Sequence, residues 1–259
     1  MVQGRAYFIG AGPGDPALLT LMGAAALDRC QAAFVVPPYD QTYRSYLAGK
    51  TLFIPFAWDF IPLREKVLKL LQSGNVAFLV PGDLSVFCPF QPLLEALGSH
   101  AEVIPGVAVM NAASALLKKT LTAGHRNPRV IQLSTRLMER ADQPFGNLTE
   151  ESTLVVYMNT WPAVELGRRL RQGFGKDIPV AVFHRLGMPG ETVLKGTLKD
   201  LESLGGPWSF LQELSREEAS LTLIMAGASL SACPDGSWWD HKREQSWRHR
   251  YGSPETCNF

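Results

Sequence analysis

The stretch Gly10-Ala11-Gly12-Pro13-Gly14-Asp15-Pro16 decides the fold, and it directly follows an apolar run at residues 6–9. Further along the chain, the turn Pro81-Gly82-Asp83 follows a second apolar run at residues 76–80. A short apolar run that ends in a glycine turn is typical of a buried parallel strand. Ligands of open α/β sheets bind at the carboxyl ends of such strands, so both turns are candidate binding elements.

The first turn departs from a dinucleotide-binding fingerprint. Asp15 stands where the third glycine of that fingerprint would be, and Pro13 lacks a backbone N–H to donate to a phosphate. A glycine turn with a carboxylate and no phosphate cradle suits a ligand that has a positive centre and no phosphate. S-adenosylmethionine is such a ligand, so the turn predicts this cofactor.

Strands and helices alternate as far as residue 120, with a further strand at 32–36 and another that runs into Pro105-Gly106. The nearly continuous apolar strands predict a parallel sheet covered on both faces. A polar stretch at 121–128 contains Gly and Pro and indicates a domain junction. We expect two α/β domains with a cofactor cleft between them, at residues 1–122 and 123–232, and a C-terminal arm at 233–259.

Composition narrows the class of protein. The 259 residues are 46% hydrophobic and 19% charged, as in globular domains, and the net charge of +1 predicts no nucleic-acid partner. No apolar stretch reaches the length of a membrane helix. The four cysteines lack metal-site spacing, so we expect reduced thiols and no metal. The N-terminus has no signal-peptide core, and we therefore expect a cytoplasmic protein.

The chain resembles the tetrapyrrole methylase family in several stretches that follow one another in the family's order. They are the first glycine turn with Leu18-Leu19-Thr20-Leu21, then Gly82-Asp83, Ile104-Pro105-Gly106-Val107, Thr153-Leu154-Val155-Val156-Tyr157-Met158, Pro179-Val180-Ala181-Val182 and Gly196-Thr197-Leu198-Lys199-Asp200-Leu201. Members of this family use S-adenosylmethionine to methylate uroporphyrinogen and the precorrins. The resemblance implies two α/β domains, usually in a homodimer.

The resemblance also implies which residues contact the cofactor in the cleft. They are Pro13, Gly82, Asp83, Val86, Ala108, Val109, Met158, Ala181 and Thr197. The chain departs from the family at Leu84 and Cys88, where Pro and Gly are common, and at Ala108-Val109, where a hydroxyl residue is usual. Each lost hydrogen bond costs on the order of 1 kcal/mol, so the departures predict weaker cofactor binding or a differently shaped pocket.

Asp40 matches an acid that follows the second strand in related methylases, and it is the candidate base that accepts one proton during methylation. A turn-forming role is the alternative. The carboxylates of a precorrin predict arginines in the pocket, because guanidinium pairs with carboxylate. The candidates are Arg126, Arg129 and Arg136, with Arg44 and Arg140 as further ones. Solvated surface charge is the alternative for each arginine.

The predicted function is C-methylation of a precorrin or cobalt-precorrin in cobalamin biosynthesis. Phe78-Leu79 and Asn111-Ala112-Ala113 resemble the C-20 methylases, whereas Leu121-Thr122 and Ser134-Thr135-Arg136 resemble the C-11 methylases. Three alternatives stay open: another tetrapyrrole, a protein acceptor as in the diphthine synthases, or a cofactor-binding homologue without catalysis. The arm mixes Trp with Arg and Lys, and we expect it to pack on its own domain or on a dimer partner.

Overall fold

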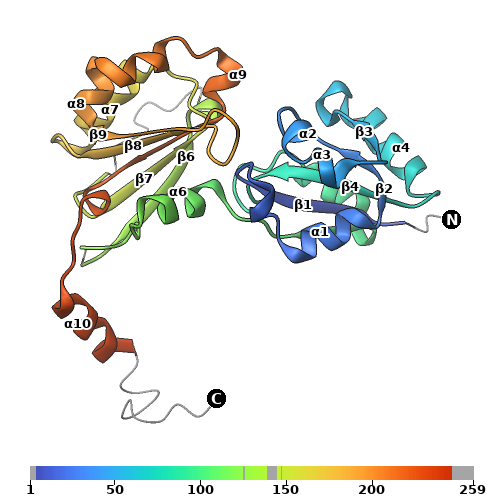
Figure 1. Cartoon of the computed structure of the whole chain (residues 1–259), viewed down its shortest axis with the longest axis horizontal. Coiled ribbons are helices and arrows are strands. Elements are labelled where there is room, and N and C mark those ends of the chain that lie inside the picture. Colours follow the sequence, from blue (N-terminus) through green and yellow to red (C-terminus); the bar gives the residue numbers. More distant parts are fainter. Residues whose placement is uncertain (1–3, 125, 139–144, 147, 247–259) are drawn as a thin grey trace.

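The computed structural model describes residues 4–124, 126–138, 145–146 and 148–246. These residues form two sheets of five strands each, in two bodies that lie side by side (Figure 1). The expected architecture of two α/β domains is confirmed. Arg140 and the last part of the arm, residues 247–259, lie outside the described residues.

The first sheet is entirely parallel, with the strand order β3-β2-β4-β1-β5. Its strands are β1 (Ala6–Gly12), β2 (Cys30–Phe34), β3 (Thr51–Phe53), β4 (Asn75–Pro81) and β5 (Ala101–Ile104). The rings of Phe8 and Phe34 stack on that of Phe78, with centroids 4.5 and 4.4 Å away. These stacked rings lie across three neighbouring strands and anchor one face of the sheet.

Helices cover both faces of the first sheet, as the apolar strands predict. They are α1 (Leu21–Asp28), α2 (Tyr39–Thr42) and α3 (Arg44–Leu47) on one face, and α4 (Phe60–Leu70) and α5 (Gln91–Leu97) on the other. Leu27 and Leu47 share a core with Ile9, whereas Val67 and Leu93 pack in the core that contains Phe78.

The helix after the first glycine turn differs from our expectation. In the sequence, Asp15 as N-cap and Pro16 at the first helical position predict one continuous helix, with Leu18, Leu21, Met22 and Ala25 on one apolar face. Instead, Asp15 caps a short 3-10 turn, η1 (Pro16–Leu18), and α1 begins separately after its N-cap Thr20. Leu21 is therefore 91% exposed, while α1 buries Ala26 and Leu27. The predicted face was wrong because the restart at Thr20 changes the helical phase.

The second sheet is mixed and has the order β6-β7-β10-β8-β9. Its strands are β6 (Arg129–Ser134), β7 (Ser152–Tyr157), β8 (Pro179–His184), β9 (Thr192–Thr197) and β10 (Thr222–Ala226). Strands β6 and β7 are parallel, and β10 is antiparallel to both β7 and β8. The carboxyl ends of β6, β7 and β8 therefore lie on the same side of the sheet. Strand β9 ends at the opposite edge.

Helices α7 (Ala163–Phe174) and α8 (Leu198–Ser203) pack on one face of the second sheet, and the short α9 (Arg216–Ala219) precedes β10. Helix α6 (Val109–Leu117) packs on the other face, where Ala113 shares a core with Val155 and Phe183. The predicted range 1–122 counts α6 with the first domain, whereas its packing groups it with the second sheet.

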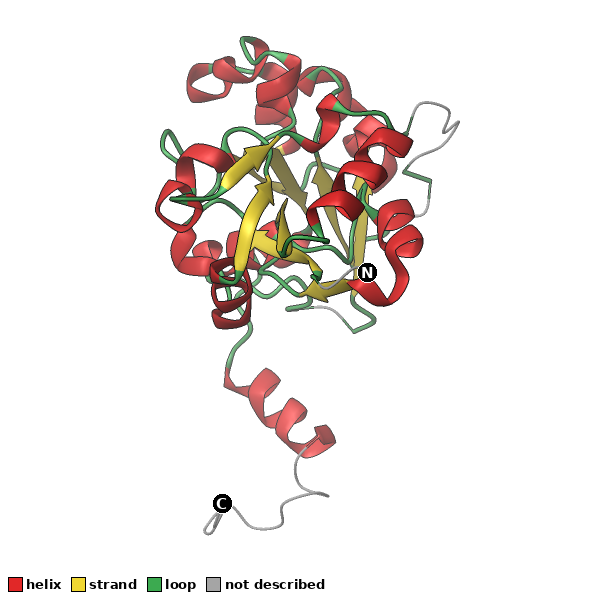
Figure 2. Ribbon diagram, turned by 90° about the vertical axis from the view of Figure 1, so that its right-hand side faces the viewer, coloured by secondary structure: helices red, strands yellow, loops and turns green. Residues whose placement is uncertain are grey.

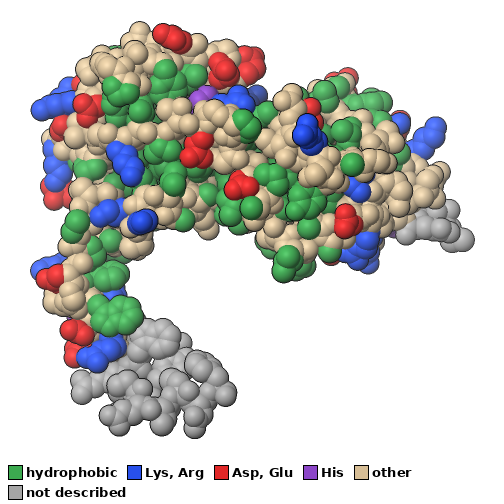
Figure 3. Space-filling view, in the orientation of Figure 1, with side chains coloured by type: hydrophobic (Ala, Val, Ile, Leu, Met, Phe, Trp, Pro, Cys, Tyr) green, Lys and Arg blue, Asp and Glu red, His purple; other side chains and the backbone are tan. Residues whose placement is uncertain are grey.

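The arm leaves the second domain beside Lys119, whose Nζ donates to the carbonyl of Ala232 at 2.6 Å. Helix α10 (Gly236–Ser246) then stands apart from both sheets (Figures 1, 2 and 3). Among the described residues, no helix combines the length and apolarity needed to cross a membrane.

Candidate cofactor site between the two sheets

The carboxyl ends of the adjacent strands β4, β1 and β5 meet through the backbones of their glycines. Gly12 and Gly82 exchange two hydrogen bonds: the Gly12 N–H donates to the Gly82 carbonyl at 3.0 Å, and the Gly82 N–H donates to the Gly12 carbonyl at 2.7 Å. A Cβ on Gly10 would lie 2.5 Å from the Gly106 nitrogen. Only glycine permits this approach, so three separate turns form one continuous surface.

The Asp83 carboxylate links the turn that contains Gly82 to the turn that contains Gly106. Its Oδ1 accepts from the Ser85 N–H at 2.8 Å, and its Oδ2 accepts from the Gly106 N–H at 3.0 Å. Burial alone would raise the pKa of Asp83, but the hydrogen bonds from Ser85 and Gly106 outweigh it and hold the pKa below its ordinary value. The carboxylate therefore stays ionised at neutral pH while it forms the turn.

Two stacked tyrosines hold the first glycine turn in place. The Tyr39 hydroxyl lies 3.1 Å from the Gly12 carbonyl and 3.0 Å from the Pro13 carbonyl, and the Tyr43 hydroxyl donates to the Ala11 carbonyl. The two rings are parallel within 5°, with centroids 5.7 Å apart. Burial raises the pKa of both phenols, so both remain donors. These tyrosines were not predicted from the sequence, although their i,i+4 spacing was a usable signal.

Residues of the second domain pack against both glycine turns. A Cβ on Gly187 would lie 2.8 Å from the Asp15 nitrogen, so the loop at 185–188 after β8 packs against the first turn. The Phe87 ring, which follows the second turn, lies 5.3 Å from the Tyr157 ring at the end of β7. The 185–188 loop was also not predicted as part of the site, although the run Gly187-Met188-Pro189-Gly190 signals a turn.

Backbone conformation marks the same region. Five non-glycine residues in the described part of the chain have a positive φ, and Lys118 and Leu204 among them simply end helices. The others are Phe87 at 56°, Met158 at 48° and Arg185 at 54°, and all three lie at the junction of the two domains. L-residues rarely adopt this conformation, and where they do they concentrate at functional sites.

Seven of the nine predicted cofactor residues lie close to the glycine turns. Those that lie on the three turns or at the strand ends facing them are Pro13, Gly82, Asp83, Val86, Ala108, Val109 and Met158. Ala181 is only 2% exposed and packs in the core beneath α6. Thr197 is not brought to these turns, because it ends β9 at the opposite edge, where it forms a capping box with Asp200.

At two departures from the family pattern the side chains contribute packing, and at a third a helix cap is missing. Leu84 and Cys88 are half-buried against the phenylalanine core of the first sheet, where apolar side chains contribute packing. Burial also raises the pKa of the Cys88 thiol. Ala108 is the N-cap of α6 and offers no side-chain acceptor to its first turn, which a Ser or Thr would supply.

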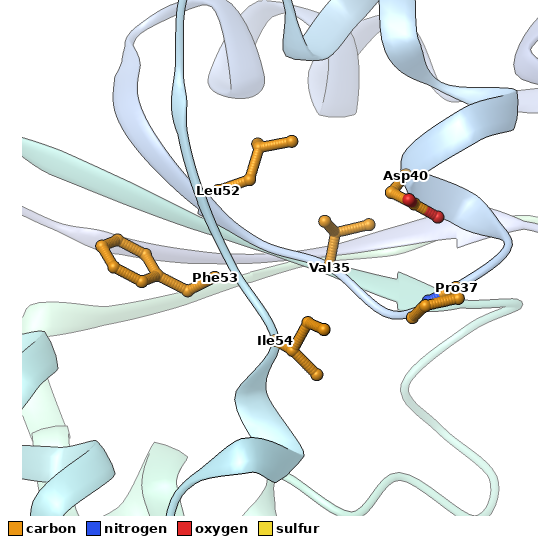
Figure 4. Close-up of a pocket in the computed structure, with 6 residues that line it drawn as sticks. All are labelled: Val35, Pro37, Asp40, Leu52, Phe53 and Ile54. Carbon is orange, nitrogen blue, oxygen red and sulfur yellow. The ribbon is translucent and has the colours of Figure 1, made fainter.

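Asp40 lines a small cavity of about 110 Å³ together with Val35, Leu52 and Ile54 (Figure 4). Its Oδ1 is buried and has no hydrogen-bond partner among the described residues. The cavity lies at the ends of β2 and β3, on the same edge of the first sheet as the glycine turns. A carboxylate oxygen left without a donor in the protein is costly, so this oxygen is well suited to a ligand that brings a donor.

The predicted arginines Arg126, Arg129 and Arg136 lie at opposite ends of strand β6. Arg136 follows β6 in the 3-10 turn η4 (Thr135–Leu137) and is exposed at the edge that faces the first domain. Arg126 and Arg129 are exposed at the start of β6, at the far edge. The described residues contain no group of three side chains that could hold a metal ion.

The two five-stranded sheets, with the glycine turns of the first facing the second, define a two-domain α/β fold. A family model, that of the Tetrapyrrole (Corrin/Porphyrin) Methylases, matches residues 5–202. This chain belongs to that family and is a methyltransferase.

A curated relative agrees with this assignment, and two solved structures agree with the fold. The precorrin-4 C(11)-methyltransferase of Pseudomonas aeruginosa is 30% identical over 210 residues, which cover 75% of this chain and 81% of the relative. The structure of a cobalt precorrin-4 methyltransferase superposes with a TM-score of 0.72, at 21% identity, over 87% of this chain and 95% of that one. A uroporphyrin-III C-methyltransferase from Thermus thermophilus, in complex with S-adenosyl homocysteine, has a TM-score of 0.64 at 23% identity, with coverage of 88% and 93%.

We predict that Gly106→Ala destabilises the protein and weakens cofactor binding together. The new Cβ would lie 2.6 Å from the Gly10 carbonyl carbon and press on the Gly82 carbonyl oxygen. Overpacking of this kind costs about 1–3 kcal/mol, which thermal unfolding would register as a drop of several degrees. Gly205→Ala is the control, since its nearest neighbour is the Ser203 Oγ at 3.8 Å. Equal unfolding temperatures for the two variants would contradict the close approach.

We predict that Asp83→Asn destabilises the protein in a pH-dependent manner. Because the folded-state pKa of Asp83 is lowered, its contribution is complete above the unfolded value of about 3.9 and is lost as pH falls through the folded value. In urea unfolding, the free energy of unfolding of Asp83→Asn should be about 1 kcal/mol lower than that of the parent at pH 6–7, and this difference should become smaller below pH 4. Asp28→Asn, at an exposed position, is the control. If the difference in the free energy of unfolding between Asp83→Asn and the parent does not change with pH, the ionised Asp83 carboxylate does not hold the two turns together.

Proposed function

We propose that this protein is an S-adenosylmethionine-dependent C-methyltransferase that acts on a precorrin or cobalt-precorrin in cobalamin biosynthesis. The carrying observation is the continuous surface formed by Gly10, Gly82 and Gly106, with the ionised Asp83 beside it. Family membership supports methyl transfer, and the relatives named above support this substrate class. The proposal includes a cytoplasmic location, which the sequence predicted.

The residues at the site fit this cofactor. Glycine turns leave backbone surface open to a closely bound ligand, and Asp83 places a negative charge where a sulfonium would be stabilised. Pro13 removes one N–H from the first turn, which disfavours a phosphate ligand. When bound, the cofactor supplies an electrophilic methyl group on a positively charged sulfur. The protein's own contribution is to hold the turns rigid through Tyr39 and Tyr43 and to exclude water between the domains.

For the acceptor we propose precorrin-4 or its cobalt form, with methylation at C-11. The C-11 name of the Pseudomonas relative supports this choice over C-20, in line with the resemblance carried by Ser134-Thr135-Arg136. Of Arg126, Arg129 and Arg136, which the structure describes, Arg136 lies at the carboxyl end of β6, facing the first domain, and we assign it to a substrate carboxylate. We assign to Asp40 the acceptance of one proton from the macrocycle, because its buried Oδ1 has no donor in the described protein.

The test is incubation of the purified protein with methyl-labelled S-adenosylmethionine and a panel of precorrins, followed by product mass and label position. The proposal expects one added methyl on precorrin-4 or cobalt-precorrin-4. Transfer to C-20 of an earlier intermediate, or to a protein acceptor only, would replace the proposed substrate. Tight cofactor binding with no transfer to any acceptor would support a homologue without catalysis and refute the proposal.

The role of Asp40 is tested in the same assay with Asp40→Asn. Loss of a general base lowers kcat by roughly 10²–10⁴-fold, while the affinity for S-adenosyl homocysteine should stay unchanged. Asp28→Asn should keep full activity. A kcat for Asp40→Asn within a few-fold of the parent would show that Asp40 forms its turn without taking part in catalysis.

A further inference from the structure

Met188 connects the cores of the two domains. It lies in the loop between β8 and β9 of the second sheet, yet it is buried in the core cluster that contains Ile9 and Tyr39 of the first domain. Every other described member of that cluster lies between residues 7 and 104. Leu186, in the same loop, packs instead in the core of the second sheet. The chain therefore crosses from one core to the other within this loop.

The loop that carries Met188 is fixed by its own hydrogen bonds. The Met188 N–H donates to the Arg185 carbonyl at 2.9 Å, and the Arg185 Nε donates to the Pro189 carbonyl at 2.9 Å. The Gly187 N–H donates to the Glu191 carboxylate at 2.7 Å. Arg185 has its positive φ in this turn, and an L-residue keeps that conformation only where its surroundings enforce it. The loop therefore presents Met188 from a defined position.

The Met188 side chain lies against the first glycine turn at Gly14. A Cβ on Gly14 would lie 2.8 Å from the Met188 Cε and still closer to its Cγ, so only glycine leaves room for this side chain. Gly187 makes the reciprocal fit, because its Cβ would meet Asp15 of the same turn. The loop and the turn thus interlock through one glycine from each domain.

Met188 shares its core with the two tyrosines that hold the turn. Tyr39 and Tyr43 are buried in the same cluster, and their hydroxyls contact the carbonyls of residues 11–13. Tyr39 is also the first residue of α2 and directly precedes Asp40, the candidate base. A side chain packed among these groups can therefore fix both the cofactor turn and the helix that carries Asp40.

We propose that Met188 is a positioning residue that holds the first glycine turn and helix α2 in the arrangement that binds the cofactor. This role rests on the proposed function, because the cofactor site is the one proposed above. It assigns to one contact the control that the second domain has over the geometry of the first. Methionine suits the role, because its flexible, unbranched thioether fills irregular gaps between packed surfaces.

Loss of the Met188 side chain should lower the fraction of molecules in which the turn is in place. A ligand binds only the competent fraction, so its apparent Kd rises in inverse proportion as that fraction falls. If the turn is in place in about one molecule in ten of Met188→Ala, the apparent Kd rises about tenfold.

The test measures backbone amide exchange in the ligand-free full chain and the Kd for S-adenosyl homocysteine. In Met188→Ala, exchange at residues 10–16 and 39–43 should become about tenfold faster or more, and the Kd should rise by a similar factor. Met188→Leu conserves apolar volume and should recover most of both effects. Circular dichroism checks that each variant folds, and Met188→Val provides a smaller truncation for the same comparison if Met188→Ala does not fold.

Leu27→Ala is the matched control, because Leu27 is fully buried in the same core but belongs to α1 of the first domain. It should lower the unfolding temperature without changing the Kd. Unchanged exchange at residues 10–16 in Met188→Ala, or an equal rise in Kd in Leu27→Ala, would overturn the role of Met188. A parent chain without affinity for S-adenosyl homocysteine would refute the proposed function, whereas the exchange rates would still decide whether Met188 holds the turn.

Discussion

The close approach of three backbones, at Gly10, Gly82 and Gly106, is the constraint on which the rest of the site depends. A side chain on Gly10 or Gly106 would push apart the ends of adjacent strands. The reciprocal hydrogen bonds between Gly12 and Gly82 extend the sheet one step beyond its regular ladder. Asp83 then binds the third turn by accepting from Gly106. The carboxyl ends of three parallel strands thereby form one continuous backbone surface beside the Asp83 carboxylate.

The remaining features of the site hold this surface in a fixed position. Tyr39 in α2 and Tyr43, which lies between α2 and α3, hold the first turn through hydrogen bonds, and the loop at 185–188 packs against it from the second domain. Phe87 and Tyr157 meet at the other side, and burial raises the pKa of the Tyr157 phenol to about 12. Residues of both domains thus meet at the candidate site, and the positive φ angles of Phe87, Met158 and Arg185 lie there as well.

The sequence predicted the elements whose signals are local. The glycine turns, the apolar strands and the position of Asp83 follow from short patterns, and the structure places them as expected. The buried face predicted for the first helix was wrong, because the N-cap at Thr20 competes with the earlier cap at Asp15. Propensity alone does not decide between two adequate caps.

Strand pairing and domain packing could not be predicted from the short sequence patterns. Thr197 matches a family motif, yet the antiparallel pairing of β9 carries it to the edge opposite the glycine turns. Arg126 and Arg129 lie at the start of β6 and Arg136 follows its end, and which of the two ends faces the first domain depends on how the domains pack. The 185–188 loop was missed because its contact with Asp15 depends on how the two domains pack. Register and domain packing, which spacing does not encode, decide these outcomes.

The most direct test of the account is hydrogen–deuterium exchange of the full chain with and without saturating S-adenosyl homocysteine. If the glycine turns bind the cofactor, exchange should slow at residues 10–16, 82–88, 106–110 and 185–188 and stay unchanged at 192–200. Protection confined to 192–200 or to the arm, with the glycine turns unaffected, would contradict it.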